Sequence, residues 1–195
     1  MTTANKITII RILMIPFFIF CAMQPGAGMQ IAALVLFCVA SFTDFLDGYI
    51  ARKYNQVTDF GKFVDPLADK LLVTAALLLF IENGIFPAWM VFIILAREFI
   101  ITSLRIVAAN KGRVLAATWT GKVKTCVQIG GIILLFLSLI VFNLTPQGMN
   151  SAPQPIWTAL VWEIAPWIVT IVTLYSGWDY LAKNWDLIKE GAVKQ

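Results

Sequence analysis

Four aspartates at helical spacing are the residues of this chain that are best suited to chemistry. Asp44 and Asp47 lie three positions apart, and Asp65 and Asp69 lie four positions apart, in strongly apolar surroundings. Each spacing places its pair on one face of a helix. If the two helices run antiparallel, the four carboxylates converge in one pocket. Because like charges repel and charge in a membrane segment is costly, a cation must compensate them.

Oxygen ligands alone favour a hard divalent ion such as Mg²⁺, Mn²⁺ or Ca²⁺. The chain contains no histidine, which removes the commonest transition-metal ligand and the commonest general base. Two divalent ions balance four carboxylates, and such a pair can clamp a phosphoryl group during displacement. Gly48, Ala51 and Gly61 leave room for a ligand. Arg52 adds a guanidinium fork for phosphate.

The alternative is that the acidic residues lie in a solvated loop and the small residues only pack helices. We favour this interpretation for Asp59, which falls midway along the expected loop, but not for the other four aspartates. Two helical pairs on either side of one short turn are hard to obtain by accident. Two starts of the third helix remain open: it begins at Asp65 with Pro66 at its first position, or it begins earlier and kinks.

Six apolar segments must position these residues. The chain has 195 residues and 59% hydrophobic content, above the roughly 45–50% of soluble domains. Segments of about 20 residues can cross the hydrocarbon of a bilayer. The sequence predicts an all-α, polytopic integral membrane protein, a bundle of six transmembrane helices forming a single domain over 1–195. The predicted spans are roughly 8–24, 30–50, 63–85, 87–109, 121–142 and 156–182.

Basic residues lie on one side of the predicted membrane. They occur near both termini and in alternate connections, whereas about 25–29, 83–87 and 143–155 contain none. By the positive-inside rule, both termini are cytosolic. The first segment is expected to be an uncleaved span, because Arg11 and Pro16 interrupt it and no clean cleavage site follows. The net charge of +4 fits anionic lipid headgroups as partner and no nucleic acid.

Two arginines lie within the predicted fourth span, where a charge needs an anionic partner. Arg97 lies well inside it, and Arg105 follows eight residues later on nearly the same face. They could bind an anionic ligand or form structural ion pairs, with Glu98 or the aspartates as partners. Lys124 is interpreted, with Lys111 and Arg113, as a topology-setting or lipid-contacting charge. Cys21, Cys38 and Cys126 are expected to be small core residues.

The stretch 44–69 resembles the CDP-alcohol phosphotransferase signature D-x2-D-G-x2-A-R-x8-G-x3-D-x3-D. All eight positions match without a gap. The resemblance implies a six-helix membrane enzyme, usually dimeric, that moves a substituted phosphate from a CDP-linked donor to an alcohol and releases CMP. It also implies that Asp44, Asp47, Asp65 and Asp69 bind two Mg²⁺ or Mn²⁺ ions. Asp69 is implied to deprotonate the acceptor hydroxyl.

Further stretches resemble the phosphatidylglycerophosphate synthase branch of this family. They are residues 5–11, 65–72, 96–105 and 120–125. This resemblance implies transfer from CDP-diacylglycerol to glycerol 3-phosphate in a bacterial inner membrane, with the active site facing the cytosol. It implies that Gly48, Ala51, Arg52 and Gly61 lie at the donor and that Arg97, Arg105 and Lys122 bind the acceptor phosphate.

Three alternatives stay open. The same chemistry could use another acceptor, namely phosphatidylglycerol, inositol phosphate or serine. An ion or metabolite transporter would also carry intramembrane carboxylates, although such sites tend to lie at the midplane of interrupted, repeated helices. A non-catalytic metal-binding scaffold would leave the basic residues of the fourth and fifth spans without a purpose.

Overall fold

The structure is a computed structural model that describes residues 3–53, 59–110, 112–113, 115–116, 118–144, 156–186 and 189. Within these ranges it does not describe the side chains of 3–6, 44–53, 59–63, 65–66, 69 and 110. The predicted loop at 143–155 therefore lies outside the described residues from 145 onward.

Six α-helices make up nearly all of the described chain, and these residues contain no strand. The helices are α1 (Thr3–Met23), α2 (Ala27–Lys53), α3 (Asp59–Glu82), α4 (Ala88–Asn110), α5 (Trp119–Leu144) and α6 (Ile156–Lys183). The predicted all-helical fold is confirmed for the described residues. Two helices, α5 and α6, are long and apolar enough to cross a membrane by length and composition, among the residues that were described.

The third helix begins at Asp59, well before the aspartate pair that it carries. Of the two starts left open by the sequence, the one at Asp65 is wrong, because helix α3 continues through Pro66. The assignment of Asp59 to a loop is also wrong, since it is the first residue of α3. Polar residues continue both helices beyond the predicted spans, α2 to Lys53 and α3 from Asp59.

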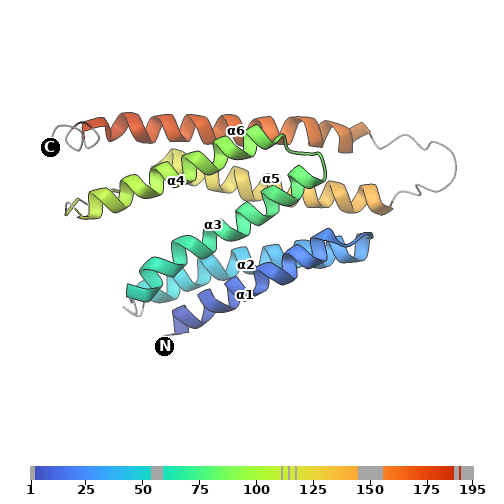
Figure 1. The fold of residues 1–195 in the computed structure, drawn as a ribbon, viewed down its shortest axis with the longest axis horizontal. Helices are drawn as coiled ribbons and strands as arrows, with labels where there is room; N and C mark the ends of the chain where they lie inside the picture. Colours follow the sequence, from blue (N-terminus) through green and yellow to red (C-terminus); the bar gives the residue numbers. More distant parts are fainter. Residues whose placement is uncertain are drawn as a thin grey trace.

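The helices pass back and forth between two ends of an elongated bundle (Figure 1). At one end lie the start of α1, the end of α2, the start of α3, the end of α4, the start of α5 and the end of α6. The links from α1 to α2 and from α3 to α4 lie at the other end. Glycines in the left-handed region terminate two helices: Gly84 (φ +70°) follows α3, and Gly112 (φ +73°) follows α4.

A cluster of phenylalanines forms the middle of the core. Phe136 of α5 contacts Phe80 of α3 and Phe18 of α1, with ring centroids 5.0 and 5.7 Å apart. Phe37 of α2 lies against Phe18 at 5.9 Å. All four side chains are buried. Because this cluster joins four helices, it fixes their relative heights and so the level of the polar end.

Two glycines allow α6 to approach its neighbours closely. A Cβ on Gly131 of α5 would lie 2.9 Å from Cγ2 of Val169 on α6. A Cβ on Gly177 of α6 would lie 2.9 Å from Cγ of Arg97 on α4. Both distances are too short for a real contact, so these positions bring the helix backbones together.

Candidate active site

The end of α2 and the start of α3 bring the predicted carboxylates to one end of the bundle. Asp44 and Asp47 lie on the last part of α2, and Asp65 and Asp69 on the first part of α3. These two helices contact each other, and the end of α2 lies beside the start of α3 in Figure 1. The four side chains themselves lie outside the described residues. Among the described side chains, no group of three or more His, Cys, Asp or Glu could hold a metal.

The predicted donor residues share these two helix ends. Gly48, Ala51 and Arg52 follow Asp47 on α2, and Gly61 precedes Asp65 on α3. The structure thus places all eight signature positions on two helices in contact, and their side chains are not described.

Arg97 lies on α4, and its guanidinium contacts residues of two helices. Nη1 donates to Oε1 of Glu98 at 3.1 Å, and Nη2 donates to Oγ of Ser176 on α6 at 2.7 Å. Its Nε is buried and has no hydrogen-bond partner among the described residues. The ion pair with Glu98 was the structural alternative considered for Arg97, and it is present. The arginine is therefore held from two sides.

Arg105 lies about two turns further along α4 and pairs with α6 as well. Its Nε donates to Oη of Tyr180 at 3.1 Å, and its guanidinium carbon lies 5.3 Å from the centroid of the same ring. Tyr180 is buried. The phenol and the ring together fix the guanidinium on the side of α4 that packs against α6.

The two lysines near the start of α5 have opposite environments. Lys122 is exposed, whereas Lys124 is 5% exposed and forms an ion pair with Glu98. Residues two apart on a helix differ by about 200° in direction, so both cannot face the bundle. The interpretation of Lys124 as a lipid-contacting charge is wrong. The helical register separates the exposed Lys122 from Arg97 and brings Lys124 to Glu98 instead.

Side-chain hydrogen bonds fix the start of helix α5. Thr118 accepts a hydrogen bond from the backbone N of Gly121 at 3.2 Å, which is the geometry of an N-cap. Thr120 donates to Oδ2 of Asp179 on α6 at 2.7 Å, and Lys183 pairs with the same carboxylate at 2.7 Å. The cap and the Asp179 contacts together set the rotation of α5, and therefore which lysine faces inward.

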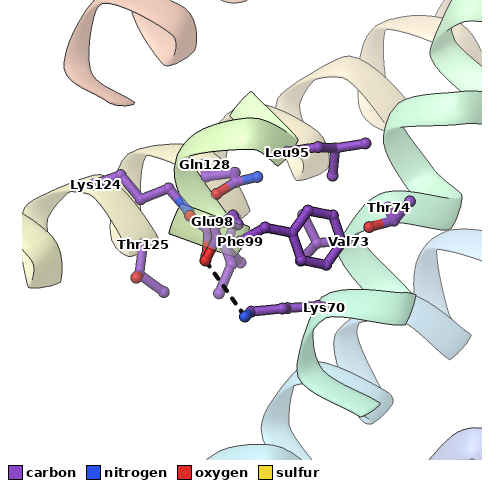
Figure 2. Close-up of a pocket in the computed structure, with 10 residues that line it drawn as sticks. Lys70, Val73, Thr74, Leu95, Glu98, Phe99, Lys124, Thr125 and Gln128 are labelled. Carbon is purple, nitrogen blue, oxygen red and sulfur yellow. Dashed lines mark hydrogen bonds and ion pairs between the residues drawn. The ribbon is translucent and has the colours of Figure 1, made fainter. Parts of the chain in front are cut away.

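A cavity opens between α3, α4 and α5 beside these charged residues (Figure 2). Its lining residues are Lys70, Val73, Thr74, Leu95, Glu98, Phe99, Lys124, Thr125, Gln128 and Ile129. Lys70 directly follows Asp69 on α3, so the cavity begins at the level of the predicted carboxylate site. Our sequence interpretation missed Lys70 and Gln128 here. The position of Lys70 in an apolar span was a usable signal for an intramembrane charge.

Sequence comparison places this helical bundle in a known class. Residues 1–175 match the profile of the CDP-alcohol phosphatidyltransferases. The chain therefore belongs to the CDP-alcohol phosphatidyltransferase family, a family of transferases, as its signature predicted.

Individual relatives match much of the chain, two of them over more than nine tenths of it. A Bacillus subtilis (strain 168) protein named CDP-diacylglycerol–glycerol-3-phosphate 3-phosphatidyltransferase is 43% identical over 95% of this chain and 96% of its own length. A Mycobacterium tuberculosis (strain H37Rv) protein named probable phosphatidylglycerophosphate synthase is 36% identical over 92% of this chain and 80% of its own. An Escherichia coli (strain K12) protein with the same name as that of B. subtilis is 42% identical over 63% of this chain and 70% of its own.

Proposed function

We propose that this chain transfers the phosphatidyl group of CDP-diacylglycerol to glycerol 3-phosphate, producing phosphatidylglycerophosphate and CMP. The observation that carries this proposal is the 43% identity, over 95% of the chain, to a relative named for that reaction. The arrangement of the helices supports it, since the signature positions of α2 and α3 lie at the end of the bundle that also carries the basic residues of α4 and α5.

Asp44, Asp47, Asp65 and Asp69 are the residues that would hold divalent ions. They fit Mg²⁺ or Mn²⁺, because they are four oxygen donors on two helices in contact and two such ions balance their charge. Bound there, two divalent ions would supply Lewis-acid stabilisation of the charge that develops on the donor's diphosphate.

The chain's own residues would orient the reactants and move the proton. Arg52 binds the diphosphate of the donor as a bidentate cation, and Gly48, Ala51 and Gly61 leave space for its approach. Asp69 accepts the proton of the primary hydroxyl of glycerol 3-phosphate. That oxygen forms a bond to the lipid-side phosphorus, the bond from this phosphorus to the CMP oxygen breaks, and CMP leaves with the bonding electrons.

The acceptor phosphate is assigned to basic residues of α4 and α5. Arg97, Arg105 and Lys122 are the set that the resemblance implies. Arg97 and Arg105 are fixed by Ser176 and Tyr180 of α6, which reduces the ordering cost of binding a phosphate. Lys122, on the exposed side of α5, is the member of the set with the least support from the geometry.

The proposed setting is a bacterial inner membrane. All six helices span it, residues 1–195 form one domain, and both termini and the active site face the cytosol. The passage of the helices between two ends of the bundle supports an even number of spans (Figure 1). CDP-diacylglycerol enters from the bilayer and glycerol 3-phosphate from the cytosol, and the functional unit is a homodimer.

The decisive experiment measures CMP release by the purified protein with CDP-diacylglycerol, Mg²⁺ and one acceptor at a time. We expect release with glycerol 3-phosphate and not with serine, inositol phosphate or phosphatidylglycerol. Release with one of these acceptors instead would refute the acceptor and leave the reaction class intact. Solute flux in proteoliposomes without any CMP production would favour a transporter.

A further inference from the structure

The polar lining of the cavity between α3, α4 and α5 consists mainly of hydrogen-bond donors. Lys70 and Lys124 bring two ammonium groups from opposite walls, and Glu98 is the one carboxylate among the lining residues. Figure 2 shows Lys70 and Lys124 on either side of Glu98. Leu95 and Phe99 belong to the apolar part of the lining.

Glu98 contacts cationic side chains from three helices. Its carboxylate accepts hydrogen bonds from Lys124 of α5 and, at 3.1 Å, from Nη1 of Arg97. Its backbone carbonyl accepts one from Nζ of Lys70 on α3 at 3.4 Å, and Lys70 also donates to the hydroxyl of Thr102. Glu98 therefore contacts the ammonium groups on both walls, Lys124 through its carboxylate and Lys70 through its backbone carbonyl.

Gln128 adds an unsatisfied polar group to the same wall. It lies one turn after Lys124 on α5, so both side chains project from the same face of that helix. Gln128 is 3% exposed, and its Nε2 has no hydrogen-bond partner among the described residues. A buried amide without a partner carries a desolvation cost that a ligand oxygen can relieve, directly or after rotation of the amide.

We propose that this cavity is a binding subsite for a phosphate oxyanion, with Lys70 and Lys124 as its cationic ligands and Glu98 as the residue that positions them. This inference rests on the proposed function and deepens it. The oxyanion is the phosphate of the soluble acceptor, because Lys70 adjoins Asp69 and the phosphate of a small acceptor must lie near the base that takes its proton. It moves the lysine of α5 that contacts phosphate from the exposed Lys122 to the buried Lys124. Arg97 does not line the cavity, but it adjoins this subsite through the carboxylate of Glu98, which it shares with Lys124.

The test compares Lys70→Met and Lys124→Met with the matched control Lys183→Met. Lys183 is another lysine at the same end of the bundle, but its side chain is 60% exposed and pairs only with Asp179 among the described residues. Steady-state KM and kcat are measured for glycerol 3-phosphate and, separately, for CDP-diacylglycerol. Both cavity variants are expected to raise the KM for glycerol 3-phosphate by about tenfold to a hundredfold. This is the usual loss of affinity when a hydrogen bond to a charged group is removed.

The two substrates distinguish the two sources of phosphate. We expect the KM for CDP-diacylglycerol to stay within about twofold of the parent value, since the loss concerns one substrate only. A rise in the KM for CDP-diacylglycerol alone would put a lipid phosphate in the cavity and overturn the assignment. An unchanged KM for both substrates in both variants would overturn the subsite itself.

Glu98→Gln tests the positioning role. It keeps the shape of the side chain and removes the charge that gathers Lys124 and Arg97, so the KM for glycerol 3-phosphate should rise while kcat at saturation changes little. Lys124→Arg keeps a cation beside Glu98 and should recover part of the affinity lost in Lys124→Met. Equal KM values for Lys124→Arg and Lys124→Met, with both proteins folded, would contradict an electrostatic role.

Folding is checked by thermal unfolding of each variant in the same detergent. If Lys124→Met does not fold because Glu98 loses a buried partner, the half-buried Lys70→Met decides the question, and an unchanged KM in that variant then refutes the subsite. Failure of the proposed function is seen separately. It would appear as a parent protein that releases no CMP with glycerol 3-phosphate, whatever the lysine variants do.

Discussion

Asp69 and Lys70 are neighbours in the chain, and their positions differ by about 100° around helix α3. In the proposed reaction they do different work on the same acceptor. Asp69 takes the proton of the hydroxyl, and Lys70 holds the phosphate. Because both belong to one turn of one rigid helix, the distance between the base and the phosphate site varies little with the motion of loops.

Replacing Asp69 tests the base directly. Asp69→Asn should lower the rate of CMP release by at least about a hundredfold, because general base catalysis contributes about 10² or more to a rate. Binding of CDP-diacylglycerol, measured with labelled lipid, should persist. Asp59→Asn is the matched control, since Asp59 is an aspartate of the same helix outside the predicted site. Turnover of Asp69→Asn within a few fold of the parent would remove this residue from the base role.

Chelation tests the carboxylate cluster. EDTA should stop CMP release, and Mg²⁺ or Mn²⁺ should restore it. The same ions should raise the temperature of thermal unfolding, because a ligand that binds only the folded state stabilises it. Asp44→Asn should reduce this rise. A protein that is equally active and equally stable with and without chelator would contradict the metal site.

The sequence predicts which residues could form the site, and their spacing, better than it predicts the direction in which their side chains point. The aspartates, Arg97 and Arg105 could be predicted as site residues because charge in an apolar span is costly and spacing reveals a shared face. The choice between Lys122 and Lys124 depends on the rotation of α5, which the Thr118 cap and the Asp179 contacts set through tertiary structure. The same limit applies to Cys126, which was expected in the core and is exposed.

Helices α5 and α6 are the elements whose packing depends most plainly on small residues. Gly131 lies against Val169, whereas a Cβ on its neighbour Gly130 would meet no atom of another described helix within 4 Å. In a membrane, where the solvent is as apolar as the side chains, close packing supplies much of the attraction between helices. Gly131 is therefore expected to contribute to the packing of α5 against α6, whereas Gly130 is not.

Alanine substitutions separate them. Gly131→Ala should destabilise the protein by about 1–3 kcal/mol, because the added methyl group overpacks the contact with Val169. Gly130→Ala should be neutral or stabilising, since alanine is the better helix former. Thermal unfolding of both variants in the same detergent measures the difference. Equal loss of stability in the two variants would show that the helix contact is not limited by space at Gly131.

The sequence predicts the helices themselves well and their ends less well. Apolar segments of spanning length predicted six helices, and the described residues contain six. The predicted ends fail where polar residues continue a helix, as α3 does from Asp59 and α2 does to Lys53. Hydropathy reports where a chain can contact lipid, and a helix does not have to stop where that contact stops.

The two ends of the helical bundle carry different features. One end collects the signature positions, the charged cavity and the ties between α5 and α6, and the other carries the glycine turn after α3. If the helices span the membrane as proposed, all of the polar chemistry lies on one side. Orientation therefore determines which pool of acceptor the enzyme can use.

Cysteine labelling tests this orientation. In a background with Cys21, Cys38 and Cys126 replaced by serine, Asn83→Cys should react with a membrane-impermeant maleimide added to intact spheroplasts. Arg113→Cys should react only after permeabilisation. Both native residues are exposed, so access to the thiol depends on its side of the membrane. Labelling of Arg113→Cys in intact spheroplasts would reverse the proposed topology.

If Arg97 takes part in acceptor binding as proposed, its close contact with Gly177 links the choice of acceptor to the packing of α6 against α4. Any larger residue at position 177 needs the volume that Cγ of Arg97 fills. A shorter residue at 97 would free that volume, but it would also remove a partner of Glu98 and Ser176. The two positions must therefore change together. A related enzyme that uses an uncharged acceptor and lacks Arg97 would therefore need a different packing of α6 against α4. Enzymes that differ in their acceptor should then differ at both positions.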